Sequence, residues 1–324
     1  MSEAVTDPPI LGRATPPARP RAGSRTLRCT DPLDPMLTLA PLRRSAYDPV
    51  HRITPDGALW RGTLTANGPC AYRIVADPTT AEVEIRAWGA GYAEVLDGFE
   101  DLVGATDDPS GFEPGHSLLS RLARRFAGWR VCRTGRVWEA LLPAVLEQKV
   151  TSTEAWRSWR ELVWRFGERA PVPAGGPQLW VPPGPGTLRT LPSWEWHRAG
   201  VGPDRMRTLV RCARVVDRLQ QSVGMSHQEA DARLRVVPGV GVWTSAEVRQ
   251  RAHGDPDAVS VGDYNLPKAV GWVLTGRRFD DAEMLAALEP WRGHRYRVTK
   301  LIELSSLRPP RRGPRLPPRD YRSF

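Results

Sequence analysis

The chain has 324 residues and a mass of 36.0 kDa, which is enough for roughly two domains of ~100–200 residues with a sizeable buried core. Hydrophobic residues make up 40% and charged residues 25% of the chain, a balance that excludes disorder throughout. No window approaches the ~18 consecutive apolar residues of a membrane span, and the N-terminus carries acids and prolines where a signal peptide needs an apolar core. We therefore expect a cytoplasmic protein without a membrane partner.

The charge is strongly basic. The chain has 46 basic and 36 acidic residues, a net charge of +10 and a pI of about 10.1. This excess favours a polyanionic partner, with nucleic acid as the first candidate. Almost all the cations are arginines, since the lysines are only Lys149, Lys268 and Lys300. GC-rich coding would produce the same bias, so charge alone leaves the partner open.

The four cysteines argue against a metal centre. They lie far apart in the sequence and form no C-x-x-C pair: Cys29, Cys70, Cys132 and Cys212. Zinc sites and iron–sulfur clusters usually need closely spaced cysteines. We expect free thiols and no bound metal.

Residues 27–112 are predicted to form a strand-rich domain. Apolar and polar residues alternate over 81–87 and around Tyr72 and Ile74, and Ala58–Thr65 reads as a third strand. Turn residues separate these segments, which predicts a small antiparallel sheet with one solvated face. The segments 1–26 and 308–324, rich in Pro and Arg, are predicted to be flexible tails.

Residues 113–307 are predicted to be mainly helical, since after Gly91 the apolar period changes to 3.6. A strong stripe runs from Met206 to Leu219 and is backed by Arg205, Arg207, Arg211, Arg214 and Arg218. The segment Pro171–Pro192 contains seven prolines. It is predicted to be a long connection between two helical groups, because proline is excluded from helix interiors.

The segment of about residues 226–252 is predicted to be a helix, a tight hairpin and a second helix. Ser226 and Glu229 have the spacing of a capping box, and Val237-Pro-Gly-Val-Gly-Val-Trp243 follows the first helix. Glycines permit a sharp turn and close approach of another molecule, and helix N-terminal amides attract phosphate. An ordinary turn between two helices is the alternative if the motif stands alone.

The motif does not stand alone. The segment Ser260-Val-Gly-Asp-Tyr-Asn-Leu-Pro-Lys268 follows, and then Glu289-Pro-Trp-Arg292. This order resembles the helix-hairpin-helix (HhH-GPD) DNA glycosylases, most closely the branch of bacterial 3-methyladenine DNA glycosylase II, over roughly residues 41–307. The resemblance implies an α+β fold: an N-terminal antiparallel β-sheet domain followed by a mainly α-helical, two-lobed glycosylase domain.

The resemblance implies that Asp263 is the catalytic residue. Cleavage of an N-glycosidic bond develops positive charge on the deoxyribose, so a fixed carboxylate near C1′ stabilises the transition state and can orient or deprotonate the attacking water. Taken alone, an Asp at this place is more often a helix cap. The hairpin upstream and the Pro-Trp-Arg segment downstream favour the catalytic interpretation.

The base pocket is predicted to include Trp243 and Trp291, which match pocket tryptophans of the resembling enzyme, together with Tyr264. Electron-rich rings select a cationic methylated purine after it is flipped out of the duplex. Glu247 stands where the family has a tyrosine, and it could pair with a base or face solvent. With 13 Trp in the chain, ordinary core tryptophans are the alternative.

The predicted DNA contacts come from the hairpin and from the turn that fills the gap left by the flipped base. The hairpin residues are Pro238, Gly239, Val240, Gly241 and Thr244. Gln148 could contact the orphaned partner base, and Lys149 stands in the wedge position, where the family has leucine. A lysine stem can still insert, although an apolar wedge is the usual device.

These residues predict a monofunctional DNA glycosylase that acts on alkylated purines in duplex DNA as a monomer. No lysine lies within 238–251 to serve as a lyase nucleophile. We expect no cofactor, although the resemblance would allow a monovalent cation at the hairpin. Two alternatives stay open: a catalytically silent DNA-binding protein, and a glycosylase for an oxidised or deaminated base.

Overall fold

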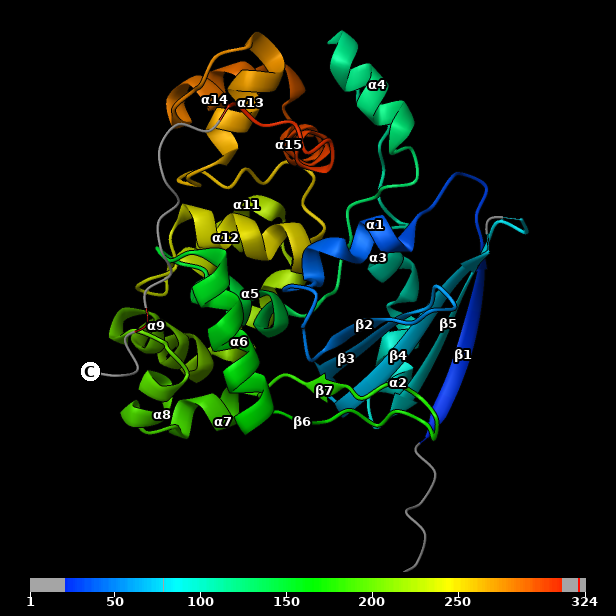
Figure 1. Cartoon of the computed structure of the whole chain (residues 1–324), viewed down its shortest axis with the longest axis vertical. Helices are drawn as coiled ribbons and strands as arrows, with labels where there is room; N and C mark the ends of the chain where they lie inside the picture. The colour runs from blue at the N-terminus through cyan, green and yellow to red at the C-terminus, as the bar shows by residue number, and fades with distance from the viewer. Residues whose placement is uncertain (1–20, 78, 311–319, 321–324) are drawn as a thin grey trace, which may run out of the picture.

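The structure is a computed structural model that describes residues 21–77, 79–310 and 320. A five-stranded antiparallel sheet forms the N-terminal part, and two groups of helices follow it (Figure 1). This confirms the α+β class. The tails predicted for 1–26 and 308–324 lie largely outside the described residues. No helix within the described part of the chain is long and apolar enough to cross a membrane.

The sheet has the strand order β1-β5-β4-β3-β2. Three of the strands were predicted from the alternating pattern: β3, β4 and β5. The strand bounds are β1 Ala22–Arg28, β2 His51–Ile53, β3 Leu59–Thr65, β4 Gly68–Asp77 and β5 Glu82–Gly89. The prediction of a flexible tail up to Thr26 was wrong for its last residues. Ala22 pairs with Trp88 and Arg28 with Glu82, so β1 satisfies its backbone groups at the edge of β5.

One face of the sheet is covered and the other only in part: the predicted solvated face is present at β1 and β5, where Ser24, Thr26 and Arg86 are exposed, but not around Trp60. Short helices pack on one face and build a core with the sheet: α1 Pro35–Leu39, α2 Tyr92–Asp97 and α3 Phe99–Val103. On the other face Leu179 packs near Trp60, whose ring stacks on Trp88 with centroids 5.3 Å apart. Gly62 makes this approach possible, because a Cβ there would lie 2.1 Å from the carbonyl oxygen of Trp180.

The covering segment belongs to the proline-rich stretch that was predicted to be a plain connection. This stretch contains the strand β7 Trp180–Val181 and the helix α7 Pro185–Thr190. The strand β7 pairs with β6 Glu168–Arg169, which lies just before the stretch. Pro185 stands at the first turn of α7, the place in a helix where proline is tolerated. The prolines therefore exclude helix interiors from this stretch but not a helix start.

The central helical lobe is built around α5. All ten residues of this helix are buried, which explains its continuous apolar sequence. The other helices of the lobe are α6 Ser152–Phe166, α8 Ser193–Arg198, α9 Pro203–Arg214, α10 Val216–Gln220, α11 His227–Arg235 and α12 Val242–Val248; α5 itself spans Val137–Leu146. The stripe predicted from Met206 to Leu219 is interrupted at Val215, where φ is −121°.

A second lobe packs four helices around its own core at the upper end of the molecule (Figure 1). Three of them follow the hairpin in the sequence, and α4 joins them from before α5. Their bounds are α4 Ser117–Arg125, α13 Leu266–Thr275, α14 Asp281–Leu288 and α15 Arg295–Leu304. The helical part thus has two separate cores, as the predicted two-lobed domain requires.

A buried ion pair fixes α5 against the sheet. Arg61 on β3 donates to the carboxylate of Glu139 on α5 at 3.0 and 2.5 Å, and the Thr63 hydroxyl donates to the same carboxylate. Although burial alone would raise the pKa of Glu139, Arg61 and its neighbours lower it below its usual value. The charged pair therefore persists in the interior, and it holds the first turn of α5 against β3.

Candidate nucleic-acid interface and active site

The hairpin lies between α11 and α12, as predicted. The Ser226 side chain caps the amide of Glu229, and Glu229 bonds back to Ser226, so the capping box is formed. Gly239 has φ +99°, and a Cβ on it would lie 2.1 Å from the hydroxyl oxygen of Thr208 on α9. Glycine is thus required there for both its backbone conformation and its space.

The hairpin residues divide into an exposed and a buried set. Pro238, Gly239 and Gly241 are exposed, whereas Val240 is 4% and Thr244 2% exposed. The side chain of Val240 packs into the core and that of Thr244 bonds to Gln148, so a contact of these two residues with DNA stays a prediction for their backbone. Only the hairpin backbone and the exposed residues remain for such a contact.

The turn after α5 is bonded to the hairpin. The Gln148 amide donates to the carbonyl oxygen of Gly239 at 2.9 Å and to the Thr244 hydroxyl at 2.8 Å. The next residue, Lys149, is exposed and has φ +54°, a conformation that is strained for any residue with a Cβ. The structure thus brings the predicted wedge position next to the predicted phosphate-binding hairpin.

Three carbonyl oxygens of the hairpin, where the resemblance would allow a monovalent cation, already accept hydrogen bonds. Val237 accepts the amide of Val240, Gly239 accepts from Gln148, and Pro238 accepts from the Arg211 guanidinium at 3.3 Å. Each of these oxygens keeps a second lone pair, while the positive charge of Arg211 opposes a second cation beside Pro238.

Asp263 lies in the loop before α13 and is half-buried. One carboxylate oxygen, Oδ1, accepts the amides of Asn265 at 2.7 Å and Leu266 at 2.8 Å. The other oxygen has no hydrogen-bond partner among the described residues. The side chain therefore bonds the amides of the N-cap residue Asn265 and of the first residue of α13, which is close to the capping role of the structural alternative, and these two bonds hold the carboxylate in place.

Glu247 does not face solvent, which was one of the two expectations for it. Its carboxylate accepts from Arg251 and from the Ser260 hydroxyl, at 2.8 and 2.6 Å. Burial alone would raise the pKa of Glu247, but Arg251, Ser260 and Arg44 lower it below its usual value. Ser260 also accepts the amide of Asp263 on its carbonyl oxygen at 3.2 Å. Through Ser260, Glu247 is thus connected to the loop that carries Asp263.

The three predicted pocket aromatics lie in different surroundings. Trp243 packs against the central lobe and Trp291 against the upper lobe, and the Trp291 indole donates to the carbonyl oxygens of Glu113 and Pro114. Tyr264 is 77% exposed, with the Lys268 ammonium 3.1 Å from its ring centroid. No ring-to-ring contact joins the three across the described residues, so a shared pocket stays a prediction.

Two groups at this site were missed by sequence reasoning: the Ser260 hydroxyl and the Arg251 guanidinium, which together hold Glu247. The i, i+4 spacing of Glu247 and Arg251 could have signalled an ion pair on one helix. No comparable signal exists for Ser260, because its bond to Glu247 spans 13 residues and depends on how the loop folds back over α12.

Sequence comparisons identify relatives in DNA repair. The chain is 28% identical over 219 residues to a probable bifunctional transcriptional activator/DNA repair enzyme AlkA of Mycobacterium tuberculosis, covering 62% of this chain and 43% of that protein. It is 24% identical over 180 residues to a DNA-3-methyladenine glycosylase of Bacillus subtilis, covering 54% and 59%. The chain thus spans about half the length of these curated relatives. No protein-family model matches it.

Solved structures share the fold. The 3-methyladenine DNA glycosylase of Archaeoglobus fulgidus matches with a TM-score of 0.73 and 16% identity, over 87% of this chain and 98% of that one. An 8-oxoguanine glycosylase/lyase of Clostridium acetobutylicum, solved with double-stranded DNA, matches with a TM-score of 0.66 and 12% identity, over 87% and 96%. The chain thus has the fold of these helix-hairpin-helix DNA glycosylases, and its sequence is similar to that of two proteins named for DNA repair and 3-methyladenine removal.

Proposed function

We propose that this chain is a monofunctional DNA glycosylase that removes alkylated purines from duplex DNA. The observation that carries the proposal is the geometry of Asp263. Its carboxylate is fixed by two backbone amides through one oxygen, and it stands in the loop that follows the helix-hairpin-helix. The relatives in M. tuberculosis and B. subtilis, named for DNA repair and 3-methyladenine removal, support the same substrate class.

In the proposed reaction, Asp263 acts on the sugar of a nucleotide flipped out of the duplex. As the bond between the base and C1′ lengthens, positive charge develops on the deoxyribose, and the carboxylate stabilises it. The same group can accept a proton from the attacking water, so the products are a free base and an abasic site. Because the two amides already hold the carboxylate, little reorganisation accompanies the step.

Alkylated purines suit this chemistry because a methyl group on N3 or N7 makes the base cationic. The positive charge weakens the glycosidic bond and attracts aromatic faces, for which Trp243, Trp291 and Tyr264 are the candidates. Glu247 supplies a negative charge close to the same loop. An oxidised or deaminated base is the second candidate substrate, because the Glu247 carboxylate, paired with Arg251 and Ser260, can also recognise the polar edge of such a base.

The proposal of a monofunctional enzyme rests on the absence of a lysine at the position in the hairpin where a lyase carries its nucleophile. A lyase needs an amine nucleophile near C1′, and the hairpin offers Trp243 at the corresponding position. Lys268 is the lysine closest in sequence to Asp263, and its ammonium is engaged on the Tyr264 ring. Sodium borohydride trapping on abasic DNA tests this directly: a covalent adduct of wild type that is lost in Lys268→Gln would overturn monofunctional action.

Base release is the decisive experiment. Purified protein is incubated with randomly methylated duplex DNA, and free 3-methyladenine and 7-methylguanine are measured, with duplexes containing 8-oxoguanine or hypoxanthine in parallel. We expect methylated purines to be released and strand nicking to need added alkali. Release of no base from any substrate would overturn the enzymatic proposal in favour of a silent DNA-binding protein, and release from the parallel duplexes alone would replace the substrate class.

A further inference from the structure

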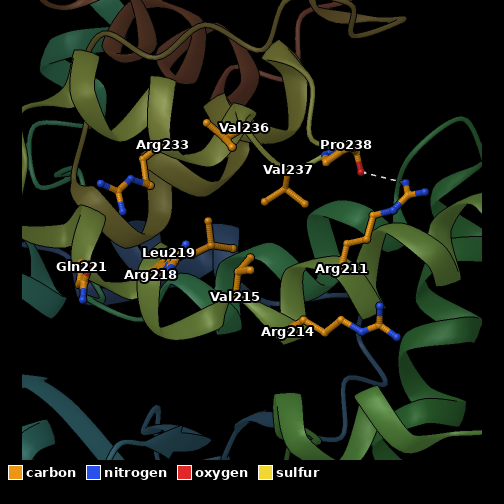
Figure 2. Close-up of a pocket in the computed structure, with 10 residues that line it drawn as sticks. All are labelled: Arg211, Arg214, Val215, Arg218, Leu219, Gln221, Arg233, Val236, Val237 and Pro238. Carbon is orange, nitrogen blue, oxygen red and sulfur yellow. Dashed lines mark hydrogen bonds between the residues drawn. The ribbon is translucent and has the colours of Figure 1, made fainter.

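A groove lies beside the hairpin (Figure 2). Its volume is about 660 Å³, and it runs between α9 and α10 on one side and the C-terminal end of α11 on the other. The floor is apolar and includes Val215, Leu219 and Val237, and four arginines stand around it: Arg211, Arg214, Arg218 and Arg233. None of its described lining residues is acidic or aromatic.

The charges of this groove are largely uncompensated. No ion pair involves any of the four arginines within the described residues 21–77, 79–310 and 320. By contrast, Arg207, which the sequence pattern also places on the polar side of this stretch, is paired with Asp204 at 2.5 Å. Arg211, Arg214 and Arg218 are also exposed. Unpaired guanidinium groups around one groove favour an anionic ligand, because each of them can donate two hydrogen bonds to a phosphate or a carboxylate.

The groove is continuous with the hairpin. Pro238 belongs to both, and Figure 2 shows the Arg211 guanidinium reaching the carbonyl oxygen of Pro238. Arg211, Arg214 and Arg218 follow one another at intervals of three and four residues along α9 and α10. A strand that leaves the hairpin on this side would therefore meet the arginines one after another.

We propose that this groove is a second DNA contact that binds the sugar-phosphate backbone of undamaged duplex beyond the hairpin. The proposal rests on DNA as the substrate of the proposed function. The absence of aromatic rings among the described lining residues argues against bound bases, which stack on such rings in single-strand sites. The apolar floor suits the faces of deoxyribose rings, and the contact carries no sequence information, as is usual for backbone contacts.

The test uses Arg214→Gln/Arg218→Gln, and the control is Arg207→Gln, which removes a paired charge from α9, the helix of Arg214. Affinity for a duplex containing a tetrahydrofuran abasic analogue is measured across a series of salt concentrations. The slope of log K against log[salt] is negative, and each lost phosphate contact reduces its magnitude by about 0.9. We expect the double variant to reduce this magnitude by about two and to weaken binding at least tenfold near 0.1 M salt, while Arg207→Gln stays close to wild type.

A second measurement locates the contact. The duplex is shortened from about two to about one helical turn of flank, about 10 bp per turn, on one side at a time. The difference in DNA affinity between wild type and the double variant should disappear when the flank on one particular side of the abasic site is shortened. If the double variant matches Arg207→Gln in slope and affinity, or if neither shortening matters, the proposal is wrong, and an acidic protein segment becomes the occupant to examine.

The outcome is separable from that of the proposed function. If wild type releases methylated purines but the groove variants bind DNA normally, only the groove proposal fails. If wild type releases no base but the groove variants bind DNA more weakly, the groove contact stands and the enzymatic proposal fails.

Discussion

The Gln148 side-chain amide lies 2.9 Å from the carbonyl oxygen of Gly239, and this hydrogen bond connects the turn after α5 to the hairpin between α11 and α12. The two segments are 91 residues apart in the sequence. The predicted wedge and the predicted phosphate contact therefore lie side by side.

Replacing Gln148 by Ala should loosen this connection. Two hydrogen bonds are lost, to Gly239 and to Thr244, each of which contributes roughly 0.5–1.5 kcal/mol. We expect the free energy of unfolding in urea to fall by about 1–2 kcal/mol and the affinity for abasic duplex DNA to fall several-fold. Gln228→Ala, at an exposed position of α11, is the control. Equal affinities of the two variants would show that Gln148 does not position the hairpin.

Variants at Asp263 should separate its capping role from its chemistry. Asparagine caps helices about as well as aspartate, so Asp263→Asn should keep the bonds to Asn265 and Leu266 and unfold at nearly the wild-type urea concentration. Base release should still fall by about 10²–10⁴-fold, because the amide can neither carry the charge nor accept the proton. Asp263→Ala should lose about 1 kcal/mol of stability as well. An active Asp263→Asn would exclude this residue as the catalytic group.

The sequence predicts the features of this structure that depend on neighbouring residues, and it fails for those that depend on contacts between distant segments. The capping box of Ser226 and the glycine at 239 are local features, and both were read correctly. The cover over Trp60 and the burial of Glu247 were not, because they depend on segments distant in sequence that fold back onto the sheet or onto α12. Arg205 shows the same limit: it was assigned to the polar side of a helix, but it is buried and donates to the carbonyl oxygen of Leu146 at 2.8 Å.

The ion pair of Glu247 and Arg251 should make stability depend on pH. The folded state lowers the pKa of Glu247, so the stabilisation is complete above the usual pKa of about 4.3 and is lost as the pH falls through the folded-state value. Glu247→Gln leaves Arg251 without its charge partner and should lower the free energy of unfolding by about 3 kcal/mol at pH 7. The difference between wild type and Glu247→Gln should shrink as the pH is lowered from 6 towards 3.

A double variant supplies the control for that measurement. Glu247→Gln/Arg251→Met removes both charges, and replacing a buried pair by apolar groups is often nearly neutral. Its unfolding free energy at pH 7 should recover most of the loss seen in Glu247→Gln. If the single variant is as stable as wild type at pH 7, the pair contributes nothing and Glu247 is held by Ser260 alone.

Lys149 should show a conflict between stability and function. Its φ of +54° is strained for lysine and unstrained for glycine, so Lys149→Gly should raise the free energy of unfolding by about 0.5–1 kcal/mol. If the side chain fills the gap left by a flipped base, the same variant should release methylated purines at least tenfold more slowly in single turnover. Lys149→Leu keeps the backbone strain and restores an apolar wedge, so its stability should match wild type and its base release should be retained. Rapid release by Lys149→Gly would show that this side chain does not stabilise the flipped state, and slow release by Lys149→Leu would show that the ammonium makes a contact of its own.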